Sequence, residues 1–237
     1  MRFIQTLSSC LCTGIIALFT ACSQVPQSPI DSVDPFIGTG FHGHTYPGAT
    51  APYGAVQLSP DTRKGNWDAC SGYHYSDSTL IGFSHTHLSG TGCIDLGDIL
   101  FRPSLQTPLV FSHSDEKASP GYYSVNLREA GVLAELTTTP HVGIHRYTYK
   151  KGIEATLVID MDHLLDNEYI YEGWVKQTGE NELTGMRRTR GWVDNQYVFF
   201  VARFSQPFSS MEQPSERQAV LTFDTTTGKP IVCKVGV

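Results

Sequence analysis

Short runs of apolar residues recur along the chain and predict β-strands. Residues 122–127 alternate between apolar and polar, 155–160 is a continuous apolar run, and 197–204 is strongly apolar. Residues 178–181, Thr-Gly-Glu-Asn, separate two further runs and predict a hairpin turn. The other predicted strands cover 55–58, 78–83, 98–101, 133–139, 145–149, 169–176, 183–188, 219–223 and 230–235. With no convincing amphipathic helix between them, this series predicts an all-β fold of two packed sheets, a β-sandwich.

The first 21 residues are typical of a targeting segment rather than of a folded domain. Arg2 supplies a positive charge, and residues 11–21 are largely apolar but too short to span a membrane comfortably. The segment ends Leu-Phe-Thr-Ala-Cys at Cys22, which resembles a bacterial lipoprotein signal whose cysteine is lipidated. Ordinary cleavage near Ala21 is the alternative, and both interpretations predict an exported protein. We expect residues 22–32 to form a short polar tether and residues 33–237 to form the folded domain.

Composition and charge narrow the classes of function. The 237 residues are 40% hydrophobic and 17% charged, which suits one large β-domain with a substantial core. The formal net charge is -6 without a basic stripe, so the chain lacks the Lys and Arg clusters that hold nucleic-acid phosphates. Once the leader is removed, Cys70, Cys93 and Cys233 accompany Cys22. A Cys70–Cys93 disulfide is one interpretation, and small buried apolar side chains is the one we favour.

Most of the polar chemistry is concentrated in residues 67–98, which hold one Trp, three His, two Cys and four Asp among glycine turns. Trp67 offers an aromatic face that can pack on the apolar C–H face of a sugar ring. The adjacent Asp68 offers a carboxylate to the hydroxyl groups of that ring. The alternative is a core tryptophan beside a turn aspartate. Arg63, just upstream, would complete a polar cluster.

Two His-x-His pairs, His42/His44 and His85/His87, could each place two imidazoles on the same side of an extended segment. Two ligands do not complete a zinc site, and no thiolate or carboxylate stands at a clear spacing to finish one. We therefore expect these histidines to hydrogen-bond hydroxyl groups, or to satisfy buried polar groups in the loop.

Two groups of aspartates could suggest catalysis or metal binding. Glycoside hydrolysis needs an acid and a base at a set separation, but Asp95 and Asp98 are divided only by leucine and glycine, without a nearby Glu. We expect them to shape the turn through side-chain to backbone bonds. Asp160, Asp162 and Asp166 follow a buried strand. Calcium prefers such oxygen ligands, but their spacing matches no calcium loop, so we expect a solvated turn.

Several ordered motifs resemble one known family. They are VDPFIGTG at 33–40, HGHTYPGA at 42–49, QLSPDTR at 57–63, SGYHY at 71–75 and GFSHTHLSGTG at 82–92. Together they resemble the beginning of glycoside hydrolase family 92, and the resemblance extends over residues 30–237. The motifs are long and keep their order, so the resemblance is specific.

The resemblance implies both a fold and an activity. Members of family 92 are exported, calcium-dependent, exo-acting α-mannosidases that invert anomeric configuration and degrade glycans such as N-glycans. Their N-terminal domain is a large two-sheet β-sandwich of the galactose-mutarotase-like supersandwich type, followed by a C-terminal (α/α)6 domain, with the active site between the two. The general acid, the general base and most calcium ligands come from the C-terminal domain. In this chain the resemblance implies mannose-binding roles for Arg63, Trp67, Asp68, His85 and His87.

The chain stops on a strand-like segment at 231–237, where the family would continue into its (α/α)6 domain. We therefore expect the N-terminal sandwich of an α-mannosidase, with no catalytic residue and no metal ligand of its own, inactive alone. The alternatives are a stand-alone mannoside-binding module and an inactive truncated remnant. The expected partners are α-mannoside glycans, the missing domain and, through a lipid on Cys22, a membrane. The expected location is the periplasm or the outer membrane.

Overall fold

The computed structural model describes residues 28–166 and 169–237. Residues 1–32 and 33–237 form separate units, and in the first only residues 28–32 are described, with the 3-10 helix η1 at Pro29–Ser32. The predicted targeting segment and Cys22 lie outside the described residues. Within the described ranges, no helix has both the length and the apolar character needed to cross a membrane.

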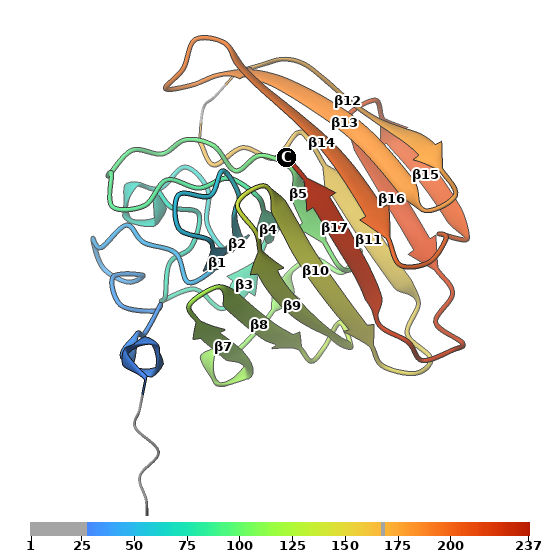
Figure 1. The fold of residues 1–237 in the computed structure, drawn as a ribbon, viewed down its shortest axis with the longest axis horizontal. Helices are drawn as coiled ribbons and strands as arrows, with labels where there is room; N and C mark the ends of the chain where they lie inside the picture. The colour runs from blue at the N-terminus through green and yellow to red at the C-terminus, as the bar shows by residue number, and fades with distance from the viewer. Residues whose placement is uncertain (1–27, 167–168) are drawn as a thin grey trace, which may run out of the picture. The chain divides into compact units, whose positions relative to one another are not determined.

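Residues 33–237 contain two large antiparallel sheets (Figure 1). The first sheet has seven strands in the order β1-β2-β4-β5-β11-β16-β15. Their bounds are Ala49–Thr50 (β1), Gln57–Asp61 (β2), Gly82–Ser84 (β4), Leu100–Arg102 (β5), Ala155–Asp160 (β11), Ser210–Ser215 (β15) and Gln218–Phe223 (β16). A separate small sheet pairs β3, Thr79–Leu80, with β6, Leu109–Val110.

The second sheet has eight strands in the order β12-β13-β14-β17-β10-β9-β8-β7. Their bounds are Glu116–Ser119 (β7), Tyr122–Leu127 (β8), Val132–Thr138 (β9), Val142–Tyr149 (β10), Tyr169–Gly179 (β12), Glu182–Arg190 (β13), Gln196–Phe204 (β14) and Ile231–Gly236 (β17). Although β17 is the last strand in sequence, it lies inside the sheet, where Val235 is opposite Ala202 of β14 and Gly143 of β10.

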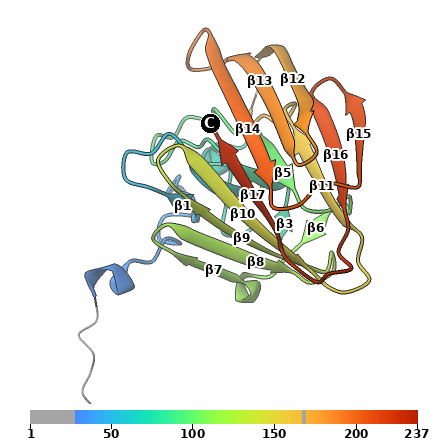
Figure 2. The same cartoon turned by 45° about the vertical axis from the view of Figure 1, so that its right-hand side comes forward.

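The hydrophobic core lies between these two sheets (Figure 2). Burial alternates along β14, so that Val198, Phe200, Ala202 and Phe204 face inward while the residues between them face outward. Strand β11 brings buried residues from the other sheet. The predicted all-β two-sheet sandwich is confirmed.

Long connections at one end of the sandwich carry most of the polar motifs. Residues 33–48 lead into β1, while 62–78 and 85–98 join short strands, and all three are gathered beside β1, β2 and β4 in Figure 1. The middle connection contains the 3-10 helix η2, Trp67–Ala69. The turn between β13 and β14, residues 191–195, projects past the end of its sheet (Figure 1). These connections supply the candidate functional site.

Candidate functional site

An exposed aromatic group lies where two of these connections meet. We call it the Trp67 cluster, and it consists of Phe41, His42, His44, Trp67 and Asp68. The ring centroids of His44 and Trp67 are 4.3 Å apart in an edge-to-face arrangement, and those of Phe41 and His42 are 4.1 Å apart. The Trp67 side chain keeps about half of its surface in solvent, with a relative exposure of 52%. The cluster therefore presents an aromatic face rather than a core contact.

Local hydrogen bonds fix Trp67 and Asp68 in place. Asn66 caps η2, since its side-chain oxygen accepts from the Asp68 backbone N–H at 2.9 Å. The Trp67 indole Nε1 donates to the carbonyl of Gly92 at 2.9 Å. His42 Nδ1 donates to Asp68 Oδ1 at 2.5 Å. Because these bonds orient the ring and the carboxylate before any ligand arrives, little side-chain entropy remains to be lost on binding.

The backbone around His42 is unusual for residues with side chains. Phe41 and His44 adopt φ angles of 54° and 57°, a left-handed conformation that is uncommon outside glycine. Gly43 between them is packed so tightly that an added Cβ would lie 2.1 Å from the Gly38 carbonyl oxygen. Such strained positions concentrate at functional sites, where the surrounding structure holds them.

His44 adds an unsatisfied polar atom to the cluster. Its carbonyl accepts from the Gly90 N–H at 2.7 Å and from the Ser71 hydroxyl, which fixes the backbone at this position. Its ring is nearly buried, and Nε2 has no hydrogen-bond partner in the protein. A buried polar atom without a partner costs free energy, so the ring is held here by its backbone and by its contact with Trp67.

The predicted mannose-binding residues do not all lie on one surface. Trp67 and Asp68 are adjacent and exposed, as their pattern predicts. The Arg63 guanidinium is only partly exposed, and its Nε donates to Asp77 at 3.1 Å, so it bonds Asp77 rather than Asp68. His85 and His87 are buried and hydrogen-bond to protein atoms. This agrees with the alternative interpretation, in which these histidines satisfy buried polar groups. Their binding roles stay predictions of the family resemblance.

His87 belongs to a buried network around Asp61. His87 Nε2 and His163 Nε2 donate to the two carboxylate oxygens of Asp61 at 2.7 and 2.9 Å. Burial alone raises the pKa of Asp61, but the two histidines outweigh it and hold that pKa well below its usual range. The network joins β2 to the segment after β11 and positions the loop that carries residues 62–78. Asp61 and His163 were not expected from sequence, since 102 residues separate them.

His85 belongs to a chain of neutral groups in the core. Its Nδ1 lies 2.7 Å from the Ile99 carbonyl, and its Nε2 lies 3.0 Å from Nε2 of His145. His145 Nδ1 lies 2.8 Å from the Tyr147 hydroxyl. A carbonyl only accepts, so His85 donates to Ile99, His145 donates to His85, and Tyr147 donates to His145. Burial lowers the pKa of His85 to about 4 and that of His145 well below its usual range.

A buried ion pair connects the two sheets. Arg187 of β13 is 1% exposed, and its Nε donates to Asp98 Oδ1 at 2.9 Å. Thr86 and Gln196 donate to the other oxygen of Asp98 at 2.6 and 2.9 Å. Neither oxygen of Asp98 is therefore left for a ligand. Arg187 gave no sequence signal, because nothing in the pattern of β13 distinguishes it from the exposed arginines around it.

The Asp95 carboxylate also accepts hydrogen bonds from the backbone. Oδ1 accepts from the Leu96 N–H at 2.8 Å, and Oδ2 accepts from the Trp192 N–H at 2.5 Å. The first bond is of the turn-shaping kind expected from the sequence. The second ties the β13–β14 turn to residues 88–97, a contact across 97 residues that the sequence does not reveal.

The described aspartates at and after the end of β11 do not fit a calcium site. Asp160 Oδ1 accepts from the Asp162 N–H and the Gln218 amide, and Asp162 is paired with Arg217 at 2.5 Å. Across residues 28–166 and 169–237, no group of three or more His, Cys, Asp or Glu is placed to hold a metal ion.

Cys70, Cys93 and Cys233 are free thiols, and burial raises the pKa of Cys70.

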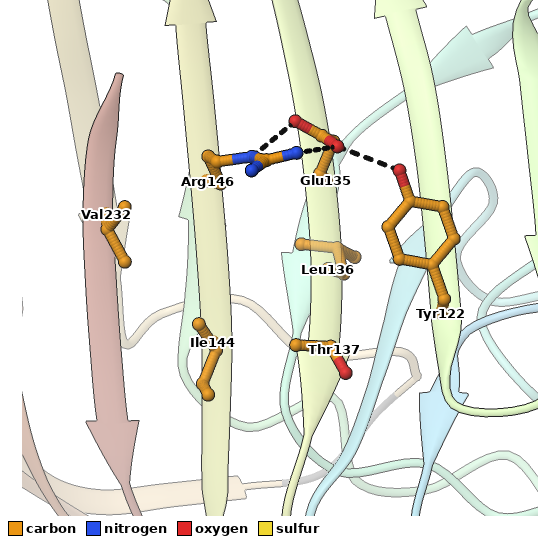
Figure 3. A pocket seen from close by; sticks show the side chains of 7 residues that line it. All are labelled: Tyr122, Glu135, Leu136, Thr137, Ile144, Arg146 and Val232. Carbon is orange, nitrogen blue, oxygen red and sulfur yellow. Dashed lines mark hydrogen bonds and ion pairs between the residues drawn. The ribbon is translucent and has the colours of Figure 1, made fainter. Parts of the chain in front are cut away.

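A hollow of about 320 Å³ lies on the outer face of the eight-stranded sheet (Figure 3). Arg146 Nε donates to Glu135 at 2.6 Å, and the Tyr122 hydroxyl donates to the same carboxylate at 2.9 Å. These polar groups therefore satisfy one another across a shallow, open surface. The Trp67 cluster is the better candidate, because it combines an exposed aromatic face, a fixed carboxylate and strained backbone.

Three comparisons relate the chain to known proteins. A family model described as the glycosyl hydrolase family 92 N-terminal domain matches residues 32–237. The structure of the family 92 α-mannosidase BT3965 from Bacteroides thetaiotaomicron, solved with mannoimidazole, is 35% identical with a TM-score of 0.80 over 87% of this chain. The family 92 glycosyl hydrolase ccman5 is 28% identical with a TM-score of 0.75 over 86% of this chain.

A curated relative, described as an uncharacterized secreted glycosidase of Arthroderma benhamiae, is 28% identical over 180 residues, or 67% of this chain. All these relatives are much longer than this chain. It spans 32% of each of the two solved chains and 23% of the curated relative. The activities of those proteins therefore belong to molecules of which this chain matches one part.

Proposed function

Because the chain belongs to glycosyl hydrolase family 92, as an N-terminal domain of that family, we propose that it forms one wall of the mannose-binding site of an α-mannosidase. The observation that carries this proposal is the Trp67 cluster, in which an exposed indole is fixed beside a carboxylate. A relative that shares this fold was solved with mannoimidazole. Mannose is accordingly the sugar that we assign to the cluster.

The cluster has the chemistry to hold a pyranose ring. The Trp67 face packs on the apolar C–H face of the sugar, which buries apolar area on both partners. Asp68 accepts hydrogen bonds from ring hydroxyls, and the exposed imidazole of His42 shares that carboxylate. A bond from a neutral hydroxyl to an ionised acceptor is stronger than one between neutral groups, so Asp68 orients the sugar while Trp67 supplies affinity.

Hydrolysis requires groups that the Trp67 cluster does not contain. Inversion needs two carboxyl groups, one as general acid and one as general base, and the cluster has only Asp68. Asp95 and Asp98 are committed to backbone and to Arg187. We infer that the acid, the base and most of the calcium ligands of an exo-acting, inverting enzyme are supplied by the (α/α)6 domain. The chain alone then binds mannosides without cleaving them.

Export is part of the same proposal. The leader at residues 1–21 supports it, as does the description of the Arthroderma relative as secreted. We infer lipidation at Cys22 and a location in the periplasm or on the outer membrane. Mass spectrometry of the mature protein tests this inference, since a diacylglycerol on an N-terminal Cys22 is expected, and a free N-terminus near Ala21 would contradict it.

A stand-alone mannoside-binding module is the second candidate function. It is favoured by one observation, namely that the Trp67 cluster is assembled entirely from residues of this chain. The two candidates share the binding step and differ in hydrolysis. They are distinguished by adding a family 92 (α/α)6 domain, which confers mannosidase activity only if the first candidate is correct.

The proposal is tested by titrating the purified chain with methyl α-mannoside and following the ligand by NMR. We expect weak binding, a dissociation constant raised at least about tenfold by Trp67→Ala, and no hydrolysis of an aryl α-mannoside. Trp174→Ala is the matched control, since Trp174 lies on β12 outside the cluster. Affinity that survives Trp67→Ala, or hydrolysis by the chain alone, would show the proposal to be wrong.

A further inference from the structure

The β13–β14 turn presents a second exposed tryptophan. Trp192 is 64% exposed, more than Trp67, whereas Trp174, the third tryptophan, is partly buried on β12. In the described part of the chain, no side-chain hydrogen bond or ring contact engages the Trp192 indole. A single exposed apolar residue needs no explanation. The backbone contacts that hold Trp192 in its exposed position do need an explanation.

The backbone of the turn is anchored to a buried carboxylate. The Trp192 N–H donates to Asp95 Oδ2 at 2.5 Å, and Asp95 is almost fully buried. Gly191 packs directly against the same carboxylate, since a Cβ added there would lie 2.4 Å from Asp95 Oδ1. On the other side of the turn, Arg188 donates to the Asn195 side chain at 2.6 Å. These contacts hold the backbone of the turn at both ends, while the indole itself stays exposed.

The same loop that anchors Trp192 also orients Trp67. Gly92 accepts from the Trp67 indole, and Asp95, three residues later, accepts from the Trp192 backbone. The backbones of Gly92 and Asp95 can be no more than about 11 Å apart, because each step along the chain covers at most about 3.8 Å. The two exposed tryptophans are therefore both tied to one short segment of the same loop, Trp67 through its indole and Trp192 through its backbone.

We propose that Trp192 is a second sugar platform, which binds a residue of an α-mannosidic glycan beyond the one held at the Trp67 cluster. This inference rests on the proposed function. Trp67 and Asp68 would hold one mannose, and the chain of sugars would continue toward Trp192, whose face would pack on a further ring. Asp95 is a positioning residue that fixes the turn.

The test compares the affinity of the purified chain for α-linked mannotrioses with its affinity for methyl α-mannoside. The readout is the ratio of the two dissociation constants. We expect the wild-type chain to bind a mannotriose more tightly, and Trp192→Ala to reduce that preference by roughly tenfold. Trp192→Tyr retains an aromatic face and should restore most of the preference. The matched control Trp174→Ala should leave the ratio unchanged.

Asp95→Ala tests the anchor independently. It should reduce the preference for the mannotriose in a protein that still carries Trp192, because the turn is released. A ratio that is unchanged in Trp192→Ala, or a wild-type chain that binds methyl α-mannoside but gains nothing from a mannotriose, overturns the inference and leaves the proposed function standing. A wild-type chain that binds neither sugar overturns the proposed function, and the inference with it.

Discussion

At the scale of single residues, the buried histidines control how this fold responds to acid. The chain from Tyr147 through His145 and His85 to Ile99 has each nitrogen committed as donor or acceptor. Adding a proton to either ring would turn an acceptor nitrogen into a second donor facing a donor. Burial opposes the charge as well, which is why the pKa of His85 falls from 6.5 to about 4.

The chain should therefore lose stability in mild acid. The unfolded state takes up the His85 proton below pH 6.5 and the folded state only near pH 4, so the free energy of unfolding falls as pH drops through this window, by on the order of 3 kcal/mol. Asp61 does not contribute in this window, since its lowered pKa preserves its stabilisation into stronger acid. Urea unfolding at a series of pH values measures the slope.

His141 provides the control for this prediction, because it is exposed on the surface. His141→Gln should retain the slope between pH 6.5 and 4, whereas His85→Gln should reduce it to the part that His145 contributes. A stability that is constant or rises on acidification would refute the assignment of His85 as a neutral buried group.

Gly43 allows the geometry of the Trp67 cluster to be tested without touching its side chains. Gly43→Ala would force a Cβ to 2.1 Å from the Gly38 carbonyl, so the loop must move and carry His42 with it. We expect the dissociation constant for methyl α-mannoside to rise about tenfold or more. Gly40→Ala, in the same loop, meets only an ordinary contact at 3.5 Å and should bind as wild type. Equal affinities in the two variants would contradict this account.

At the scale of elements, Arg187 and Asp98 tie β13 of the larger sheet to the segment that enters β5 of the smaller one. Arg187→Ala leaves the Asp98 carboxylate buried without its charge partner and should lower the free energy of unfolding by about 3–5 kcal/mol. Arg203→Ala is the matched control. It removes an exposed partner of Glu182 and should cost less than about 1 kcal/mol. Urea unfolding of both variants checks the difference, which similar losses would disprove.

The sequence predicted strands well where burial alone decides them. The run at 155–160 became β11 with the same bounds, and residues 122–127 became β8. Strand β15, Ser210–Ser215, was missed because it lies at a sheet edge and has no buried residue to mark a face. Strand β7, Glu116–Ser119, is likewise a polar edge strand. Pairing with a neighbour, rather than its own side chains, makes each of them a strand.

The same distinction holds for the candidate site. Trp67 and Asp68 were proposed from residue type alone, since an aromatic ring beside a carboxylate suits a sugar whether or not the fold is known. The sequence did not show whether a histidine faces solvent or the core. His85 and His87 are buried against partners that are far away in sequence, His145 and Asp61. Trp192 gave no signal, because its importance arises from Asp95.

At the scale of the whole molecule, we expect calcium to change neither the stability nor the sugar affinity of this chain alone. Its candidate ligands Asp160 and Asp162 are already bonded to protein partners. Removing calcium with EDTA should leave the thermal midpoint and the methyl α-mannoside affinity of the chain unchanged. A midpoint that rises with added calcium would reveal a site in the chain and contradict this expectation. In the complete enzyme of the proposal, EDTA should abolish hydrolysis.

The position of β17 has a consequence for how the molecule is made. A ribosome delivers Ile231–Gly236 after every other strand of the larger sheet, yet this strand joins β14 to β10. Before its arrival the sheet exists as two fragments with open edges, and the partners it needs were synthesised long before. Vectorial synthesis thus keeps the larger sheet incomplete until β17 has emerged from the ribosome.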